Sequence, residues 1–204
     1  MSKGKILVIS GPSGVGKGTV VKELLKDADE FALSISATTR QPREGELDGV
    51  NYFFLTKEKF LAKAESNQML EYAEYCNNYY GTPREYVENT IEKGKNIILE
   101  IEVQGAMKVK ESMPEAVTLF IMPDKWETLE RRLHKRGTES EEVIQERLKT
   151  AITEIQQAHK YDYIVINGEL EKCIEDVKSV IEVEGMKTSY NLDFIKGVLK
   201  DANA

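Results

Sequence analysis

The sequence is short of cysteine and histidine, which excludes disulfide scaffolds and the usual zinc sites. It has two cysteines, Cys76 and Cys173, and two histidines, His134 and His159. The cysteines lie far apart and lack metal-ligand spacing, so we expect reduced thiols that serve as packing residues. Neither histidine belongs to a catalytic or metal-binding pattern, and we assign both to surface or packing roles.

Basic character and long apolar runs are also missing. The formal net charge is −7, which argues against a general binder of nucleic acids or membrane surfaces, since those carry basic footprints. No apolar run approaches the roughly 18 residues that span a bilayer, and no leader precedes the first expected strand at Ile6. These features predict a soluble cytoplasmic protein in which any anion site is local.

A glycine-rich stretch between a strand pattern and a helix pattern is the feature around which the chain is organised. The apolar run Ile6 to Ile9 precedes it, and the helical pattern from Val20 to Leu25 follows it. Glycines let successive backbone N–H groups turn toward one anion, and the helix adds the positive end of its dipole. The loop comprises Gly11, Pro12, Ser13, Gly14, Val15, Gly16, Lys17, Gly18 and Thr19. This order predicts a nucleoside-triphosphate site, and the alternative is a glycine-rich turn with a solvated lysine.

One position departs from the common form of this motif. The Ser or Thr that usually follows the lysine and touches Mg²⁺ is replaced by Gly18, and the hydroxyl comes one residue later at Thr19. We therefore expect Thr19 to bond an inner phosphate. Mg²⁺ would be held mainly by phosphate oxygens and water, with no direct protein ligand assigned.

The remaining pattern predicts one α/β domain with a mostly parallel sheet and helices on both faces. Apolar runs without alternation, typical of buried parallel strands, occur at 97–99, 117–122 and 163–167. Helical patterns cover 103–112, a segment opened by Pro123 and Asp124, a segment capped by Ser140, and 170–183. In such sheets ligands lie beyond the carboxyl ends of the strands.

A lobe at about 37–92 and a helical lid at about 127–158 interrupt this alternation. In and before the lobe we expect strands at 31–36 and 51–55, a helix capped by Thr56, and an antiparallel pair within 69–80. Thr82 and Pro83 then have the pattern of a helix start. The domain is expected to span 1–186.

Residues 187–204 form a predicted C-terminal helical tail. Its apolar residues recur at helical spacing: Tyr190, Leu192, Phe194, Ile195, Val198 and Leu199. So short a helix is marginal alone, and we expect the stripe to be buried against the chain's own core helices. The alternative is burial against a second copy.

Several motifs in the same order resemble those of the guanylate kinase family, over about residues 4 to 185. Besides the loop at 11–17, the matching stretches are 36–46, 78–82, 100–105 and 136–139. The resemblance implies a P-loop NTPase-type α/β fold with a small mixed lobe that binds a nucleoside monophosphate. It implies transfer of the terminal phosphate of ATP to GMP, giving ADP and GDP, with Mg²⁺ as cofactor. The partners are then ATP and GMP, without nucleic acid or membrane, and the chain is a monomer or homodimer.

The resemblance also assigns the GMP site. Arg40 and Arg43 would hold the GMP phosphate with the hydroxyls of Tyr52 and Tyr80, and the planar fork of arginine suits phosphate oxygens. The alternative is a solvated loop with incidental charges.

Guanine would be read by Glu71, with Ser36 and Thr82 as helpers. A carboxylate only accepts hydrogen bonds, so it fits the adjacent N1–H and N2 amino donors that adenine lacks. A rim glutamate without a partner is the competing interpretation.

Further residues are assigned to the reaction and to ATP. Lys17 reaches the outer phosphates, and Arg136 and Arg147 match the lid arginines that stabilise the transferring phosphate, with Arg132 as a third candidate. Asn167 resembles a residue near the adenine of ATP. Glu100 and Glu102 lie at the end of an apolar strand, and we expect them to contact substrate or a water bound to Mg²⁺. Glu100 is the candidate for the metal. The alternative is a structural role at the edge of the sheet.

Three other functions remain to be compared with this one. A non-catalytic guanylate-kinase-like interaction module is expected to have an eroded phosphate loop, whereas this chain keeps Gly16 and Lys17. A switch GTPase is disfavoured because neither Asn-Lys-x-Asp nor Asp-x-x-Gly occurs in the sequence. A kinase of another monophosphate is opposed only by Glu71, Ser36 and Thr82.

Overall fold

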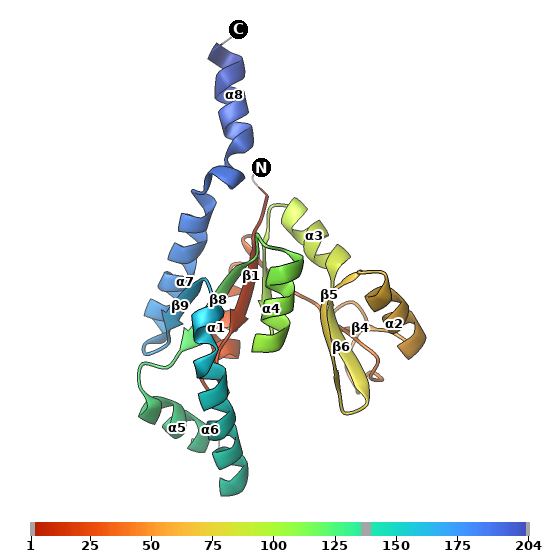
Figure 1. Cartoon of the computed structure of the whole chain (residues 1–204), viewed down its shortest axis with the longest axis vertical. Coiled ribbons are helices and arrows are strands. Elements are labelled where there is room, and N and C mark those ends of the chain that lie inside the picture. Colours follow the sequence, from red (N-terminus) through yellow and green to blue (C-terminus); the bar gives the residue numbers. More distant parts are fainter. Residues whose placement is uncertain (1–2, 136–139, 203–204) are drawn as a thin grey trace.

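The computed structural model describes residues 3–135 and 140–202, and its centre is a five-stranded parallel sheet (Figure 1). The strand order is β2-β7-β1-β8-β9. These strands are β1 (Ile6–Ser10), β2 (Phe31–Leu33), β7 (Asn96–Glu100), β8 (Val117–Met122) and β9 (Tyr163–Ile166). The predicted mostly parallel sheet is confirmed. Strand β1 lies at its middle, between β7 and β8, and all five of its residues are buried.

Helices cover both faces of this sheet, as predicted. On one face lie α1 (Lys17–Leu24) and α7 (Leu170–Gly185), and on the other α3 (Arg84–Glu92) and α4 (Val103–Ser112). Two further helices, α5 (Trp126–His134) and α6 (Glu141–Gln156), extend beyond the end of the sheet (Figure 1). Successive side chains of a strand point to opposite faces, so Leu7 and Ile9 of β1 pack with α1 and α7. Ile6 and Val8 pack with α3 and α4 on the other face. The sheet is thereby fixed between two apolar layers, and its carboxyl edge is left for ligands.

A second sheet forms the lobe to one side of the core (Figure 1). Its order is β4-β3-β6-β5, and it carries α2 (Lys57–Glu65). The strands are β3 (Ala37–Thr38), β4 (Phe53–Phe54), β5 (Met69–Tyr75) and β6 (Asn78–Pro83). The predicted antiparallel pair is β5 and β6. The strand predicted at 31–36 is shorter than expected, since β2 ends at Leu33 and β3, which begins at Ala37, belongs to the other sheet.

Three local predictions in the lobe have different outcomes. Thr56 caps α2, with its hydroxyl oxygen accepting from the backbone N–H of Lys59 at 3.3 Å. Cys76 is exposed in the β5–β6 turn at φ 48°, so its assignment as a packing residue is wrong, whereas Cys173 is buried. The helix predicted to start at Thr82 and Pro83 is α3, but its N-cap is Pro83 rather than Thr82, because β6 continues to Pro83.

The predicted lid consists of α5 and α6 (Figure 1). Helix α5 begins at Trp126, two residues after the predicted start, and Ser140 occupies the N-cap position of α6 without a side-chain cap bond. Residues 136–139, including Arg136, lie outside the described part of the chain.

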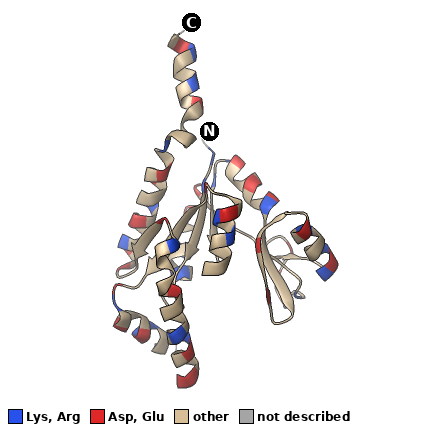
Figure 2. Ribbon diagram, in the orientation of Figure 1, with Lys and Arg blue, Asp and Glu red and all other residues tan. Residues whose placement is uncertain are grey.

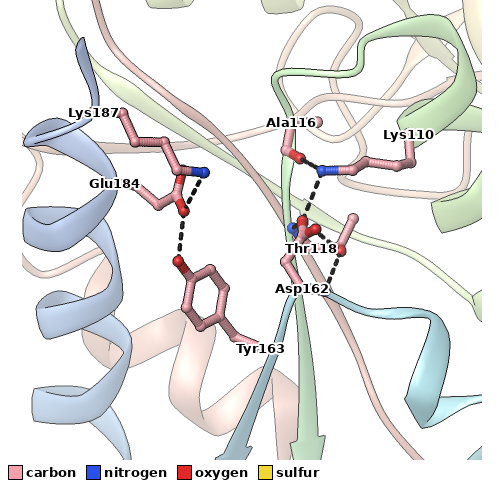
Figure 3. A network of polar contacts seen from close by, with 7 residues as sticks. All are labelled: Lys110, Ala116, Thr118, Asp162, Tyr163, Glu184 and Lys187. Carbon is pink, nitrogen blue, oxygen red and sulfur yellow. Dashed lines mark hydrogen bonds and ion pairs between the residues drawn. The ribbon is translucent and has the colours of Figure 1, made fainter. Parts of the chain in front are cut away.

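Polar side chains fix the start of β9 at the edge opposite the ligand edge (Figure 3). Asp162 accepts from the backbone N–H and the hydroxyl of Thr118, both at 2.9 Å, and from Lys110 Nζ at 2.8 Å. Burial alone would raise the pKa of Asp162, but these bonds outweigh it and hold the pKa below its usual value. The Tyr163 hydroxyl donates to buried Glu184 at 2.6 Å, and this bond raises the pKa of Tyr163 to about 12. The network joins β8, β9 and α7 into one body.

The tail forms the predicted helix, α8 (Leu192–Ala202), but it extends away from the core (Figure 1). None of the described residues of α8 is buried, and Phe194 is 73% exposed. The expectation that the stripe is buried on the parent domain is therefore wrong. At the joint between α7 and α8, the Asn191 amide donates to the carbonyls of Gly185 and Lys187, and the Lys5 ammonium lies 5.2 Å from the Tyr190 ring centre.

Charged residues of both signs are interspersed along the helices (Figure 2). Within the described residues, no helix is both long and apolar enough to span a membrane.

We predict that removal of residues 192–204 leaves the melting temperature within about 2 °C of the full chain, because α8 buries no described side chain. Differential scanning calorimetry measures this. A longer deletion from Lys187 is the comparison, since it also removes the Lys187–Glu184 ion pair of 2.7 Å and the Tyr190 ring, and it should lower the melting temperature further. A marked fall for the shorter deletion would mean that the stripe is covered in solution, and light scattering would show whether a second copy covers it.

Candidate active site

The glycine-rich loop joins β1 to α1 at the carboxyl edge of the sheet, as the sequence predicted. Gly16, the N-cap of α1, has φ 98°, a left-handed conformation that favours glycine. A Cβ at this position would also lie 2.9 Å from Asn167 Nδ2. Glycine is therefore required here both by backbone conformation and by space.

Lys17 is the first residue of α1, and its ammonium group lies against the loop. It donates to the carbonyl of Gly11 and, at 3.3 Å, to that of Pro12. Burial lowers the pKa of Lys17, and the neighbouring carboxylates, Glu154 first among them and then Glu100 and Glu102, act in the opposite direction. A partly desolvated cation is thus held against the carbonyls of the loop.

Three further side chains hold the loop from other elements. Arg132 of α5 and Asn167 after β9 each donate to the Val15 carbonyl at 2.8 Å, and Asn167 is buried. Arg147 of α6 donates to the Ser13 hydroxyl oxygen from Nε at 3.0 Å and from Nη2 at 2.8 Å. The structure thereby brings two of the three lid arginines to the loop.

A cavity of about 370 Å³ opens at the loop. Ser13, Gly14, Gly16, Lys17, Gly18, Thr19, Glu100 and Arg147 line it. An added Cβ at Gly18 would lie 3.9 Å from Glu100 Oε1, so this carboxylate faces the start of α1. Among the described residues no group of three His, Cys, Asp or Glu side chains could hold a metal ion by itself.

A second cavity, of about 690 Å³, lies between the lobe and the core. Its lining includes Ser36, Tyr52, Glu71, Tyr80, Glu100 and Glu102. Glu100 lines both cavities. The two spaces therefore meet at the carboxyl end of β7.

Glu71 projects from β5 into the second cavity and is bonded to Thr82. The buried Thr82 hydroxyl donates to Glu71 Oε1 at 2.7 Å. Burial raises the pKa of Glu71, and the bond from Thr82 and the charge of Lys108 partly offset this. A Cβ on Gly105 of α4 would lie 3.2 Å from Glu71 Oε2, so glycine leaves room for the second oxygen. One carboxylate oxygen is thus engaged, and the other faces the cavity side of α4.

The two arginines of the lobe loop are arranged around Glu46. Arg40 Nη2 lies 2.9 Å from Glu46 Oε1, and the guanidinium lies 5.4 Å from the Tyr52 ring centre. The backbone N–H of Arg43 donates to Glu46 Oε2 at 2.7 Å, while the Arg43 side chain is exposed. Neither arginine lines the second cavity in this conformation, although both tyrosines next to Arg40 do.

A family model described as guanylate kinase matches residues 3–184. The chain belongs to the guanylate kinase family. The "Guanylate kinase" of Desulfitobacterium hafniense is 47% identical over 195 residues, which are 96% of this chain and 98% of that protein. The protein of the same name from Halalkalibacterium halodurans is 52% identical over 185 residues, 91% of each chain.

Solved structures agree with this family. The crystal structure of guanylate kinase from Anaplasma phagocytophilum superposes with a TM-score of 0.67 at 34% identity, covering 93% of this chain and 90% of that one. The SH3-kinase fragment of tight junction protein 3 has a TM-score of 0.51 at 10% identity, covers 92% of this chain and 60% of that one, and shows the fold alone. The enzyme reading is supported over the interaction module by the named guanylate kinases, which match at far higher identity.

Two carboxylates of this guanylate kinase site were missed from the sequence. Glu46 holds Arg40, and Glu154 of α6 accepts a hydrogen bond from the Ser13 backbone N–H at 3.1 Å. Glu154 follows Arg147 by seven residues, so both lie on one helix face two turns apart. That spacing was a usable signal, whereas nothing in the local pattern distinguished Glu46 from the other acids of its loop.

Glu71→Gln should make the fold more stable at neutral pH. Because burial raises the pKa of Glu71, the wild-type carboxyl contributes favourably below its unfolded pKa and loses that contribution as pH rises through the folded pKa. The glutamine carbonyl can still accept from Thr82 and carries no charge. Calorimetry should therefore show E71Q melting above wild type at pH 7, with the difference shrinking toward about pH 4.

Glu74→Gln on the same strand is the matched control, since Glu74 is exposed. E71Q and E74Q with equal melting temperatures at both pH values would contradict a desolvated charge at Glu71.

Proposed function

We propose that the loop cavity binds the phosphates of ATP, that the lobe cavity binds GMP, and that the terminal phosphate of ATP passes to GMP where the two cavities meet. The products are ADP and GDP. The observation that carries this proposal is that Glu71, a buried hydrogen-bond acceptor, and the loop lysine Lys17 line cavities that share Glu100. An acceptor suited to guanine and a cation suited to phosphate thus line two connected cavities.

Guanine recognition would use the second oxygen of Glu71, because Thr82 already engages the first. Guanine offers two adjacent donors, and a carboxylate only accepts. Ser36 lines the same cavity and can bond the base edge. A site built on such donors rejects a base that lacks them, because the buried carboxylate would be left unpaired.

The GMP phosphate would be held by Arg40, Arg43, Tyr52 and Tyr80. Arg40 is paired with Glu46 and stacked on Tyr52, so phosphate binding would exchange one anionic partner for another. The exposed Arg43 side chain would turn to the same phosphate. This exchange couples GMP binding to a rearrangement of the lobe loop.

Catalysis would consist of charge stabilisation and positioning. Phosphoryl transfer needs little covalent chemistry from a protein, and the acceptor phosphate is already an anion, so no general base is assigned. Lys17, Arg147 and Arg132 lie at the loop, and Arg136 is assigned to the same role from the sequence. Closure of the lid and lobe would exclude water that otherwise hydrolyses ATP.

Mg²⁺ fits this site as a companion of ATP. Glu100 faces the start of α1, and Mg²⁺ commonly keeps its waters while it binds one carboxylate and substrate phosphates. The ion would neutralise phosphate charge when bound. Thr19 and Glu102 would contact phosphate or water beside it, and Asn167 would serve ATP by holding the loop.

The enzyme is assigned to the cytoplasm, as a monomer or homodimer that acts on these small molecules without nucleic acid or membrane partners. A coupled assay of ADP formation against a panel of nucleoside monophosphates tests the function itself, with GMP expected as the preferred acceptor.

Lys17→Ala should lower kcat by at least about 10²-fold while the fold is retained, because Lys17 contacts loop carbonyls rather than the core. Steady-state kinetics and circular dichroism measure the two quantities. Lys22→Ala is the matched control, an exposed lysine of the same helix that should leave both unchanged. Near-normal turnover by a folded K17A protein would contradict the proposed chemistry.

Glu71→Gln should raise KM for GMP by about 10-fold or more while KM for ATP changes little, and it should narrow the preference for GMP over AMP. The reason is that the amide can present a donor where guanine also has donors. The monophosphate panel provides the measurement. An equal rise in both KM values would mean that Glu71 supports the structure rather than reading the base.

A further inference from the structure

Glu154 is a carboxylate at the phosphate loop for which the proposed transfer has no use. It belongs to the last turn of α6 (Glu141–Gln156), where the helix dipole is negative and an acid is locally unfavourable. Its Oε2 accepts from the Ser13 backbone N–H at 3.1 Å. The helix end disfavours Glu154, and its hydrogen-bond partner lies 141 residues away in the sequence. The bond to the loop therefore holds the Glu154 side chain in this position.

The partner of Glu154 is a donor of the kind that phosphate-binding loops offer to anions. Backbone N–H groups in such loops point at the ligand. A carboxylate oxygen resembles a phosphate oxygen in carrying negative charge and only accepting hydrogen bonds. Glu154 thus accepts from the Ser13 N–H the hydrogen bond that a phosphate oxygen of ATP could accept in its place.

The charges around Glu154 also favour its replacement at the loop by a phosphate group. Glu154 is the largest of the carboxylate influences on Lys17, ahead of Glu100 and Glu102. Together with Gly11, Ser13 and Lys17, these three acids line a space of about 280 Å³ beside the loop cavity. Each carboxylate that remains next to Lys17 when ATP arrives repels the incoming phosphates.

We propose that Glu154 is an internal competitor of ATP: its carboxylate occupies the Ser13 N–H in the nucleotide-free protein and leaves it when the ATP phosphates bind. The proposal rests on the assignment of the loop as the ATP site. Glu154 therefore lowers ATP affinity and is a positioning residue, because it acts through Ser13 and Lys17.

The competition has a structural consequence for the lid. Arg147 and Glu154 bond the hydroxyl and the backbone N–H of the same residue, Ser13. Release of Glu154 breaks one of these two connections and keeps the arginine. ATP binding would thus loosen the end of α6 from the loop while Arg147 stays beside the phosphates.

Titration calorimetry of the full chain with MgATP, in the absence of GMP, tests the proposal. Glu154→Ala and Glu154→Gln should bind ATP about 3- to 10-fold more tightly than wild type, with the glutamine variant intermediate because its carbonyl can still accept from Ser13. In turnover assays KM for ATP should fall while KM for GMP stays unchanged. A merely structural residue would not produce this split.

Glu146→Gln is the matched control, since it removes the same charge from an exposed position of the same helix and should leave ATP affinity unchanged. Weaker or unchanged ATP binding by a folded E154Q that still binds GMP normally would overturn the proposal. Failure of the wild-type chain to bind ATP at all would instead overturn the assignment of the loop.

Discussion

One constraint shapes this end of the structure: the carbonyls of the glycine-rich loop are satisfied by side chains rather than by a regular ladder of backbone hydrogen bonds. The carbonyls of Gly11 and Pro12 accept from Lys17, and the Val15 carbonyl accepts from Arg132 and Asn167. An unpaired buried carbonyl is unfavourable, so α1, α5 and the end of β9 are each tied to the loop. The parallel sheet brings these elements to one edge.

Cations at the site already have anionic or carbonyl partners before substrate binds. Arg40 is paired with Glu46, and Lys17 lies among carboxylates of which Glu154 is the strongest influence. Such pairing avoids leaving desolvated charges uncompensated. In the proposed function, substrate binding would be an exchange of partners, in which phosphate replaces a carboxylate. The affinity for each nucleotide would then be set by the difference between the two interactions.

The sequence was sufficient for features fixed by local pattern. The apolar run 117–122 became β8, and the helix predicted at 103–112 became α4. The glycine loop joins β1 to α1, as its pattern predicted. Thr82 was wrongly predicted to cap α3, because Pro83 takes the N-cap position and the Thr82 hydroxyl donates to Glu71 on the neighbouring strand. Glu154 was missed because its partner lies 141 residues away. Burial of the tail was wrongly expected, since periodicity reveals an apolar face and not what covers it.

The two ends of the sheet differ in how firmly they are held. Hydrogen bonds fix the end where β9 begins, whereas the contacts of Glu46 and Glu154 at the other end would be exchanged for phosphate when substrates bind. The bonds of Asp162 and Glu184 join β8, β9 and α7 at the edge away from the ligands. At the other end of β9, Asn167 carries that fixed geometry directly to the phosphate loop. The lobe, by contrast, is a separate sheet that the chain enters after β2 and leaves at Pro83. Substrate-driven closure is therefore expected to move the lobe relative to a loop that Asn167 and Arg132 hold in place.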